Sequence, residues 1–246
     1  MNAWTARSGT TDAMTTFKKS TAREYFESIV IAVILALFVR TWVFQAFKIP
    51  TGSMEQNLLI GDHLVVNKFL FAPTATGLER ALLPVADIKR GDIVVFKYPE
   101  EPDRDFVKRV IGLPGETLEV REKRVHINGQ RIDEPYVFYL EPPGQMTGQH
   151  EAIAFDLRER YGPVVIPPDS YFMMGDNRDN SQDSRYWGFL PRSYVKGKAL
   201  MVYWSFESGR EDYRDDGLGA TIERLASVVV HFFTRTRWDR LLHQIH

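Results

Sequence analysis

One stretch of this chain is long and apolar enough to cross a lipid bilayer. Ser28 to Phe47 is a run of 20 residues with a single charged side chain, Arg40, and a helix of that length spans a hydrocarbon core of about 30 Å. Arg40 lies in the last third of the run, where a long side chain can reach the headgroups, and Trp42 suits the interface. We therefore predict a transmembrane anchor over residues 25–47, after a disordered head over residues 1–24.

Two other interpretations of the apolar run stay open. A cleaved signal peptide would need small residues before its exit, but a cut after Ala46 would place the bulky Phe44 at the second recognition position. A buried helix of a soluble domain is the other alternative. If the run is an anchor, Lys18, Lys19 and Arg23 precede it, and this bias favours a single-pass protein with a cytoplasmic N-terminus and everything after residue 48 across the membrane.

The part after the apolar run has the pattern of a β-rich domain. Short runs of Val, Ile, Phe and Tyr alternate with Gly, Pro and Asp turns, and Asn128-Gly129 is a strong hairpin signal. Asp92–Tyr98 and Phe106–Gly112 are expected to pair, and residues 135–162 read as an irregular insertion. The full set of predicted strands is His63–Lys68, Asp92–Tyr98, Phe106–Gly112, Thr117–Val120, Arg124–Ile127, Val164–Ile166, Tyr171–Met174 and Leu200–Trp204.

The last segment, residues 218–246, has a helical period. Its apolar residues recur every three or four positions, and arginines follow them, which predicts a basic amphipathic tail. Such a tail rests on anionic lipid or, in the alternative, packs on the domain. The residues concerned are Leu218, Ile222, Leu225, Val229 and Phe232, then Arg235, Arg237 and Arg240.

Charge and composition exclude several classes of function. The formal net charge is −1, which gives no electrostatic basis for a nucleic-acid partner. The chain has no cysteine, so disulfides, thiol nucleophiles and cysteine-based zinc sites are excluded.

Two segments carry candidate chemistry. Pro50 and Gly52, just before Ser53, predict a tight, non-helical turn. Such a turn can present a hydroxyl and aim backbone N–H groups at one point, although most serines in such turns are only turn residues. Lys108 lies in a predicted strand and shares a face with Phe106 and Val110. Apolar neighbours disfavour a charged amine and lower its pKa, so Lys108 could act as a base; the alternative is a solvated edge-strand lysine.

A third segment, Gly175–Gly188, is dense in polar side chains. A calcium loop is a weak alternative, because Arg178 and Ser181 stand where an EF-hand needs an oxygen ligand and a glycine. Pairing of Asp176, Asp179 or Asp183 with Arg178 or Arg185 would instead hold the loop rigid beside a reacting serine.

Together these segments resemble the bacterial type I signal peptidases, which are Ser–Lys endopeptidases. The resemblance implies a mainly β fold: an antiparallel, barrel-like catalytic core over residues 48–116 and 171–217, with a smaller inserted cap over residues 117–170. The four matching stretches follow the family's order: IPTGSM around Ser53, GDHLVVNK from Gly61, RGDIVVFKYP to DFVKRVIGLPGE over Arg90–Glu116, and MMGDNRDNSQDSRYWGFLP over Met173–Pro191.

The resemblance also implies roles for single residues. Ser53 matches the nucleophile, and Lys108 the general base. Thr51 and the Ser53 N–H match the oxyanion hole, and Ser181 matches a serine that orients the lysine amine. Asp183 and Arg185 match residues that support this arrangement.

The family's function implies partners and a location. The implied substrates are exported preproteins with small residues at the cleavage site, cut without metal or cofactor by a monomer. The implied location is the inner (plasma) membrane, with the catalytic domain on its periplasmic side. In one departure, Gln56-Asn57 stands where the family usually has Pro-Thr, which leaves the rigidity of the nucleophile loop unexplained.

Three rival hypotheses are weaker. A Ser-His-Asp enzyme could use His63, which follows Asp62, but the chain has no Gly-x-Ser-x-Gly elbow. A self-cleaving repressor-type protein would need a DNA-binding head where the apolar run lies. A catalytically inactive, membrane-tethered binding module is the third.

Overall fold

The computed structural model describes residues 20–72, 78, 81, 85–140, 157–207 and 218–245. The chain divides into two compact units, Met1–Val39 and Arg40–His246. The predicted head, residues 1–24, lies almost wholly outside the described residues.

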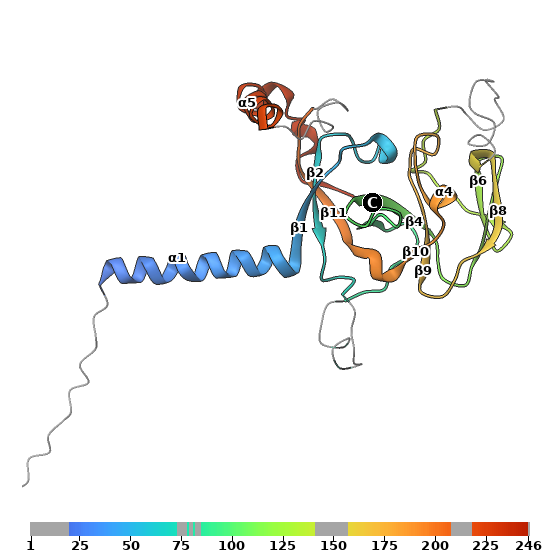
Figure 1. The fold of residues 1–246 in the computed structure, drawn as a ribbon, viewed down its shortest axis with the longest axis horizontal. Coiled ribbons are helices and arrows are strands. Elements are labelled where there is room, and N and C mark those ends of the chain that lie inside the picture. The colour runs from blue at the N-terminus through green and yellow to red at the C-terminus, as the bar shows by residue number, and fades with distance from the viewer. Residues whose placement is uncertain are drawn as a thin grey trace, which may run out of the picture. The chain divides into compact units, whose positions relative to one another are not determined.

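Helix α1, Thr21–Phe38, forms the described part of the first unit (Figure 1). The Ser20 side chain caps it by accepting a hydrogen bond from the Arg23 N–H, and none of its residues is buried. With the π-helical turn Val39–Val43 (η1), it makes a 23-residue apolar stretch, Thr21–Val43, of mean hydropathy 2.0. By length and composition this stretch can cross a membrane.

The predicted end of the anchor at Phe47 was wrong. Helical structure ends at Val43, and Phe44–Lys48 forms strand β1, which pairs with β2 in antiparallel register from Phe44 opposite Asn67 to Lys48 opposite His63. The segment FQAFK has the alternation of a strand, because Gln45 and Phe47 are half-buried and their neighbours are exposed. Hydrophobicity alone could not separate this edge strand from the helix before it.

The second unit is mainly antiparallel β, as predicted, and its strands form two sheets. The large sheet has the order β1-β2-β11-β3-β4-β9-β10, with β12 on β11, and the small sheet has the order β7-β6-β5-β8. The strands are β1 (Phe44–Lys48), β2 (Asp62–Asn67), β3 (Ile93–Lys97), β4 (Asp105–Gly112), β5 (Thr117–Arg121), β6 (Arg124–Ile127), β7 (Gln130–Arg131), β8 (Arg160–Val165), β9 (Ser170–Met174), β10 (Leu190–Pro191), β11 (Val195–Ser205) and β12 (His243–Gln244).

The centre of the large sheet is buried on both faces. In β3, Ile93 and Val95 enter one apolar cluster with Met54 and Leu58, while Val94 and Phe96 enter another on the opposite face. Strand β3 pairs with β4 as predicted. Strand β4, which carries Lys108, is therefore a central strand between β3 and β9, and its backbone is fixed on both sides.

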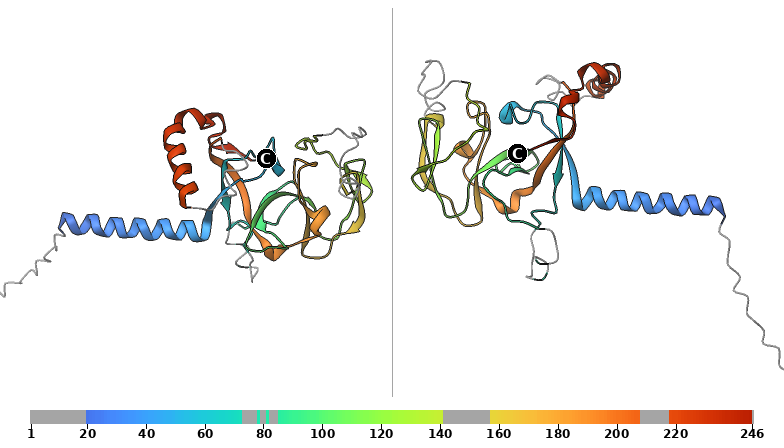
Figure 2. Two further views of the ribbon diagram at one scale, coloured as in Figure 1. Left: turned by 45° about the horizontal axis from the view of Figure 1, so that its top comes forward. Right: turned by 180° about the vertical axis from the view of Figure 1, so that it is seen from behind.

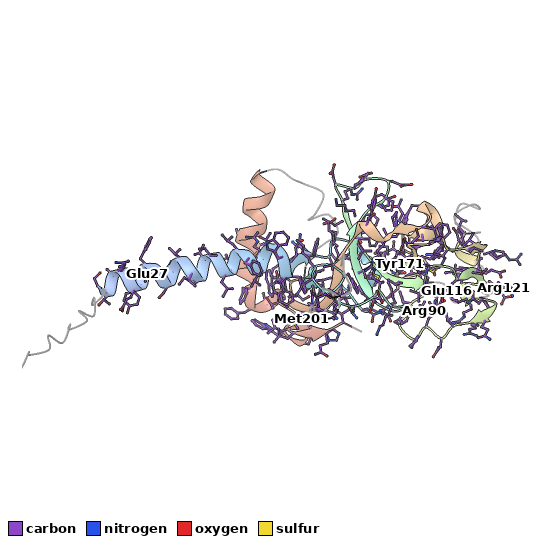
Figure 3. All side chains as sticks on the ribbon, turned by 90° about the horizontal axis from the view of Figure 1, so that it is seen from below. Glu27, Arg90, Glu116, Arg121, Tyr171 and Met201 are labelled. Carbon is purple, nitrogen blue, oxygen red and sulfur yellow. The ribbon has the colours of Figure 1, made fainter. Side chains whose placement is uncertain are left out.

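The small sheet lies within the predicted cap region, on the side of β4 and β9 away from β1 and β2 (Figure 1). Its core contains Leu118 and Val125 together with Phe172 from β9. The Asn128-Gly129 hairpin joins β6 to β7 as predicted, with positive φ at both residues. Arg90 donates a hydrogen bond to Glu116, which ties the segment before β3 to the start of the small sheet (Figure 3). Residues 141–156 of the cap region lie outside the described part.

The tail forms helix α5, Leu218–Arg235, with a kink at His231, followed by a 3-10 turn, Trp238–Arg240. It is attached to the large sheet through an isolated bridge between Phe206 and Thr236 and through β12, which pairs with β11. The predicted apolar stripe at Leu218, Ile222 and Leu225 lies outside the residues whose side chains are described.

Candidate active site

Ser53 lies in a short 3-10 turn, Gly52–Met54, rather than in the non-helical turn that Pro50 and Gly52 predicted, and apolar side chains anchor this turn. Thr51 caps the turn in an extended conformation, and Met54 and Leu58 bury their side chains in the core of the large sheet. The first N–H groups of a helical turn have no partner inside it, so the amide of Ser53 is free of intrahelical bonding. Ser53 itself is only 7% exposed. Its hydroxyl is therefore fixed in place and largely shielded from water.

Lys108 reaches this hydroxyl from the middle of β4. Its Nζ donates a hydrogen bond to Ser53 Oγ at 2.7 Å, although the two residues are 55 positions apart in the chain. The side chain lies over the Phe106 ring, with Nζ 5.1 Å from the ring centre, and the residue is 3% exposed. The predicted shared face of Phe106 and Lys108 is thus confirmed, and the lysine is a buried residue of a central strand rather than a solvated edge residue.

The environment of Lys108 favours the neutral amine. Within the described residues, no carboxylate oxygen lies within ion-pair distance of its Nζ. Burial lowers the pKa of Lys108 from 10.5 to about 8, and the more distant Asp183 and Asp176 only partly oppose this effect. At 2.7 Å from a hydroxyl, such an amine can exchange a proton with it near neutral pH.

These two residues and two further predicted ones line a single cavity of about 700 Å³. Thr51 lies exposed at its wall, and Ser181 belongs to the opposite, polar segment. The lining residues are Ile49, Pro50, Thr51, Ser53, Met54, Arg104, Asp105, Phe106, Val107, Lys108, Arg158, Asn180, Ser181, Gln182 and Tyr186. The Ser53 hydroxyl and the Lys108 amine thus lie together on the wall of this cavity.

Residues 22–204 match the profile of the family described as signal peptidase, peptidase S26. The chain belongs to this family.

Named relatives agree with the family match. Signal peptidase I of Pseudomonas aeruginosa is 38% identical, over 74% of this chain and 72% of the relative. Signal peptidase I of Aquifex aeolicus is 33% identical, over 74% and 84%, and that of Bacillus licheniformis is 34% identical, over 82% and 98%. A crystal structure of a signal peptidase I from Enterococcus faecalis is 31% identical, with a TM-score of 0.35, over 46% of this chain and 97% of the other. The family match and the curated relatives show that the chain is a serine peptidase of the signal peptidase I type, which removes signal peptides.

Asp183 and Arg185 form a buried pair behind the cavity of this signal peptidase. Arg185 donates to both Asp183 carboxylate oxygens at 2.8 Å. Burial alone would raise the pKa of Asp183, but the charge and hydrogen bonds of Arg185 hold that pKa below its ordinary value. The predicted Asp183–Arg185 pair is confirmed, and the Asp183 charge only partly opposes the effect of burial on the pKa of Lys108.

Ser181 lies where the polar loop meets the Ser53 turn. Its hydroxyl is close enough to Asp183 to favour the ionised carboxylate, yet its buried Oγ has no partner at full hydrogen-bond geometry among the described residues. Gly175 leaves room for this packing, because a Cβ there would come within 2.5 Å of the Ser53 carbonyl oxygen and nearer still to Ser181 Oγ. The position requires glycine for close approach rather than for its φ.

The other charges of the loop pair differently from the prediction. Asp176 pairs with Arg109 at 2.7 Å rather than with an arginine of its own loop. Arg178 pairs with Glu134, and Asp179 with Lys123 at 3.1 Å. Sequence reasoning missed these partners because they come from β4 and from the cap region, more than 40 positions away in the chain.

The departure at Gln56-Asn57 has a structural explanation. Gln56 has a φ of 78°, which proline cannot adopt because its ring holds φ near −65°. Asn57 Nδ2 donates to Asp176 Oδ2 at 2.6 Å and to the Tyr136 carbonyl at 3.2 Å. A side-chain tether to the buried Arg109–Asp176 pair thus holds the loop in place of a rigid proline.

Asn177 is a further residue that sequence reasoning did not single out. Its backbone N–H donates to the Ser53 carbonyl at 3.1 Å, and its side chain donates to the Gly52 carbonyl and to Glu55. The polar loop is therefore hydrogen-bonded to both Gly52 and Ser53. The position of Asn177 within a dense polar stretch predicted a rigid loop, but it did not predict this particular contact.

Within the described ranges, no three His, Asp or Glu side chains come together in the way a metal site requires. That the enzyme needs neither metal nor cofactor stays a prediction.

Proposed function

We propose that this peptidase cleaves signal peptides through a Ser53–Lys108 dyad and an acyl-enzyme. The neutral Lys108 amine accepts the Ser53 hydroxyl proton while Oγ attacks the scissile carbonyl carbon. The same proton then passes from Nζ to the departing amine, which becomes the N-terminus of the mature protein. Water, deprotonated by Lys108, hydrolyses the ester and frees the signal peptide. The observation that carries this proposal is the 2.7 Å contact between Nζ and Oγ in a buried site.

We also propose supporting roles for the residues around the dyad. Thr51 and the Ser53 amide are proposed donors to the oxyanion, each worth about 3–4 kcal/mol of transition-state stabilisation. Ser181 is a proposed positioning residue for the Lys108 amine, since both line the same cavity. Asp183 and Arg185 are proposed to fix Ser181 and its loop, since Asp183 also accepts from the Gly175 N–H.

The proposed substrates are exported preproteins whose last and third-last signal-peptide residues are small. The Thr21–Val43 stretch is proposed as a single membrane anchor, with a cytoplasmic N-terminus and the catalytic domain on the periplasmic face of the inner membrane. We propose that the enzyme acts as a monomer, because the dyad and the cavity wall come from one chain.

The test is cleavage of a preprotein by the full chain in detergent. Ser53→Ala and Lys108→Ala should each abolish cleavage, while circular dichroism shows the folded β structure. His63→Ala is the control: His63 is partly buried, with its pKa lowered to about 4 by burial, but it does not line the cavity. Near-normal turnover by either dyad variant, or an equal loss in the His63 variant, would reject the dyad.

A further inference from the structure

The cavity beside the dyad has a charged side that the proposed mechanism does not use. Arg104 and Arg158, here called the arginine pair, line this cavity together with Ser53 and Lys108. Arg104 comes directly before β4 of the large sheet, and Arg158 comes just before β8 of the small sheet. Two guanidinium groups from distant parts of the chain therefore border the space in which a peptide is proposed to be cut.

The Phe106 ring connects Arg104 to the reacting groups. Arg104, Phe106 and Lys108 are every second residue of an extended segment, so their side chains share one face. The guanidinium carbon of Arg104 lies 5.8 Å from the centre of the Phe106 ring, and Lys108 Nζ lies 5.1 Å from the same centre. A peptide that lies across this ring is therefore within reach of both the Lys108 amine and the Arg104 guanidinium.

Arg158 reaches the same cavity from the cap region. Its Nε donates a hydrogen bond to the Tyr186 hydroxyl at 3.3 Å, and Tyr186 also lines the cavity. Tyr186 belongs to helix α4, Ser184–Trp187, which lies beside the small sheet in both views of Figure 2. Among the described residues, the two terminal nitrogens of Arg158 have no hydrogen-bond partner and no carboxylate pairs with them. They are available to a ligand in the cavity.

Nearby acidic side chains do not neutralise the arginine pair. Arg104 forms an ion pair with Glu101 at 3.1 Å, but the two side chains are 61 and 58% exposed, and such surface pairs are weak and easily exchanged. Asp105 is the one acidic residue among the described residues that line the cavity, and Lys196 pairs with it at 2.7 Å. The cavity therefore presents a net positive charge on this side.

The direction of the reaction decides which part of a substrate meets the arginine pair. In the proposed reaction the departing amine takes its proton from Lys108 Nζ, which lies beside the Phe106 ring. The opposite face of β4 carries Val107, which packs with Ile49 and Met54 in an apolar wall of the cavity. Small residues at the end of the signal peptide suit that apolar wall. The first residues of the mature part then lie along the Phe106 side, toward the arginine pair.

We propose that the arginine pair binds a carboxylate side chain in the first few residues of the mature part of the substrate. Guanidinium groups bind carboxylates through paired, charge-assisted hydrogen bonds, and Arg158 is half-buried, which reduces screening of such a contact by salt. The enzyme should therefore prefer preproteins with Asp or Glu shortly after the cut to the same preproteins with Lys. The inference rests on the proposed Ser53–Lys108 dyad, because the dyad sets the direction of the substrate.

The test uses the full chain in detergent and soluble peptides that share one signal sequence. Asp, Asn and Lys are placed in turn at each of the first few positions on both sides of the cut, and kcat/KM is measured at low salt. At one or two positions after the cut, the Asp peptide should be cleaved about tenfold faster than the Asn peptide, and the Lys peptide more slowly. The absence of any Asp preference, or a preference confined to positions before the cut, would overturn the proposal.

Charge reversal assigns the preference to the two arginines. Arg158→Glu should reverse the order, so that the Lys peptide is cleaved faster than the Asp peptide, and Arg104→Glu should lower the Asp-to-Lys ratio of kcat/KM by about tenfold or more. Arg160→Glu is the matched control, because Arg160 is exposed on β8 two positions away and does not line the cavity. It should leave the ratio unchanged. An equal loss for all peptides in the Arg158 and Arg104 variants shows a merely structural role and would overturn the proposal.

Failure of the dyad and failure of the arginine pair give different results. If the dyad is wrong, Ser53→Ala continues to cleave every peptide. If only the arginine pair is wrong, Ser53→Ala is inactive, and the wild-type enzyme cleaves the Asp, Asn and Lys peptides at the same rate.

Discussion

Two lysines are buried in the described part of the chain, and their surroundings are opposite. Lys108 sits in a central strand of the large sheet, with a hydroxyl at 2.7 Å and a phenylalanine ring beside it. Lys123 sits in the β5–β6 turn of the small sheet, 3.1 Å from Asp179 and 3.9 Å from Glu159. A buried lysine next to carboxylates stays charged and joins parts of a structure together. A buried lysine without a carboxylate beside it has a lowered pKa, and its neutral amine can act as a base.

The difference follows from what each lysine connects. Lys123 and Glu134 of the cap region bind Asp179 and Arg178 of the polar loop, and Phe138 bridges Asn177. The cap region is thereby joined to the loop that carries Ser181 and Asp183. Lys108 makes no such connection and keeps its amine for the Ser53 hydroxyl.

The largest expected effect is that of Lys108→Met. Cleavage should fall by about 10³-fold, because general-base assistance is lost. At pH 7 the variant should nevertheless be more stable by about 1–3 kcal/mol, because a pKa lowered from 10.5 to about 8 reflects a buried charge that the fold bears unfavourably. Urea denaturation in detergent measures this.

The sign of the pH dependence is fixed by the lowered pKa. Below pH 8 the Lys108 amine is charged in both the folded and the unfolded chain, so the native protein bears the full free-energy cost of burying that charge. Between pH 8 and 10.5 the folded amine is neutral while the unfolded one stays charged, so native stability rises with pH. The advantage of Lys108→Met should shrink over that interval; a constant advantage would contradict the assignment.

The next largest effect is expected for Gly175→Ala, which tests whether the polar loop must touch the dyad. A methyl group there would push against the Ser53 carbonyl and Ser181 Oγ. A displacement of the nucleophile by a fraction of an ångström to 1 Å should lower kcat by about 10²-fold, with a smaller change in KM for a soluble peptide. Wild-type kcat in this variant would show that the contact has no part in positioning Ser53.

Lys123→Met is expected to act on stability rather than chemistry. It removes the cation 3.1 Å from the buried Asp179 carboxylate, and breaking such a pair costs about 3 kcal/mol. The midpoint of urea unfolding should fall, whereas kcat of the protein that remains folded should change far less than in Lys108→Met. If Lys123→Met were stabilising, the contrast between the two lysines would be lost.

The smallest effect concerns the loop after the nucleophile. Asn57→Ala removes the hydrogen bond to Asp176 and should cost about 1–2 kcal/mol, with kcat reduced several-fold. Gln56→Gly is the matched control: at a φ of 78° glycine is unstrained, so stability should be unchanged or slightly higher. Equal losses in both variants would show that backbone conformation, and not the tether, holds the loop.

The parts of the fold that depend on local pattern were predictable from the sequence. Short apolar runs between Gly, Pro and Asp turns located β3, β4, β5 and β9 to within a residue or two, and Asn128-Gly129 located a hairpin. Strand β1 was not separable from the anchor, because both are apolar and the distinction depends on pairing with β2. Short strands such as β7 and β10 depend on their partners in the same way.

In the candidate site, too, local motifs were predictable and long-range contacts were not. Ser53 and Lys108 could be named from their motifs, and the contact between them was expected only through the resemblance. The Arg109–Asp176 and Arg178–Glu134 pairs could not be named, because each joins residues 67 or 44 positions apart and no local pattern encodes the partner. The roles of Thr51, Ser181, Asp183 and Arg185 stay predictions.

The pH dependence of kcat/KM for a soluble signal-sequence peptide tests the central claim most directly, since it reports the free enzyme's essential base. The account predicts that kcat/KM rises tenfold per pH unit at low pH and levels off through a group with a pKa of about 8. A profile that is already flat at pH 6, or that keeps rising to pH 10, would contradict the assignment of a buried Lys108 amine as the base.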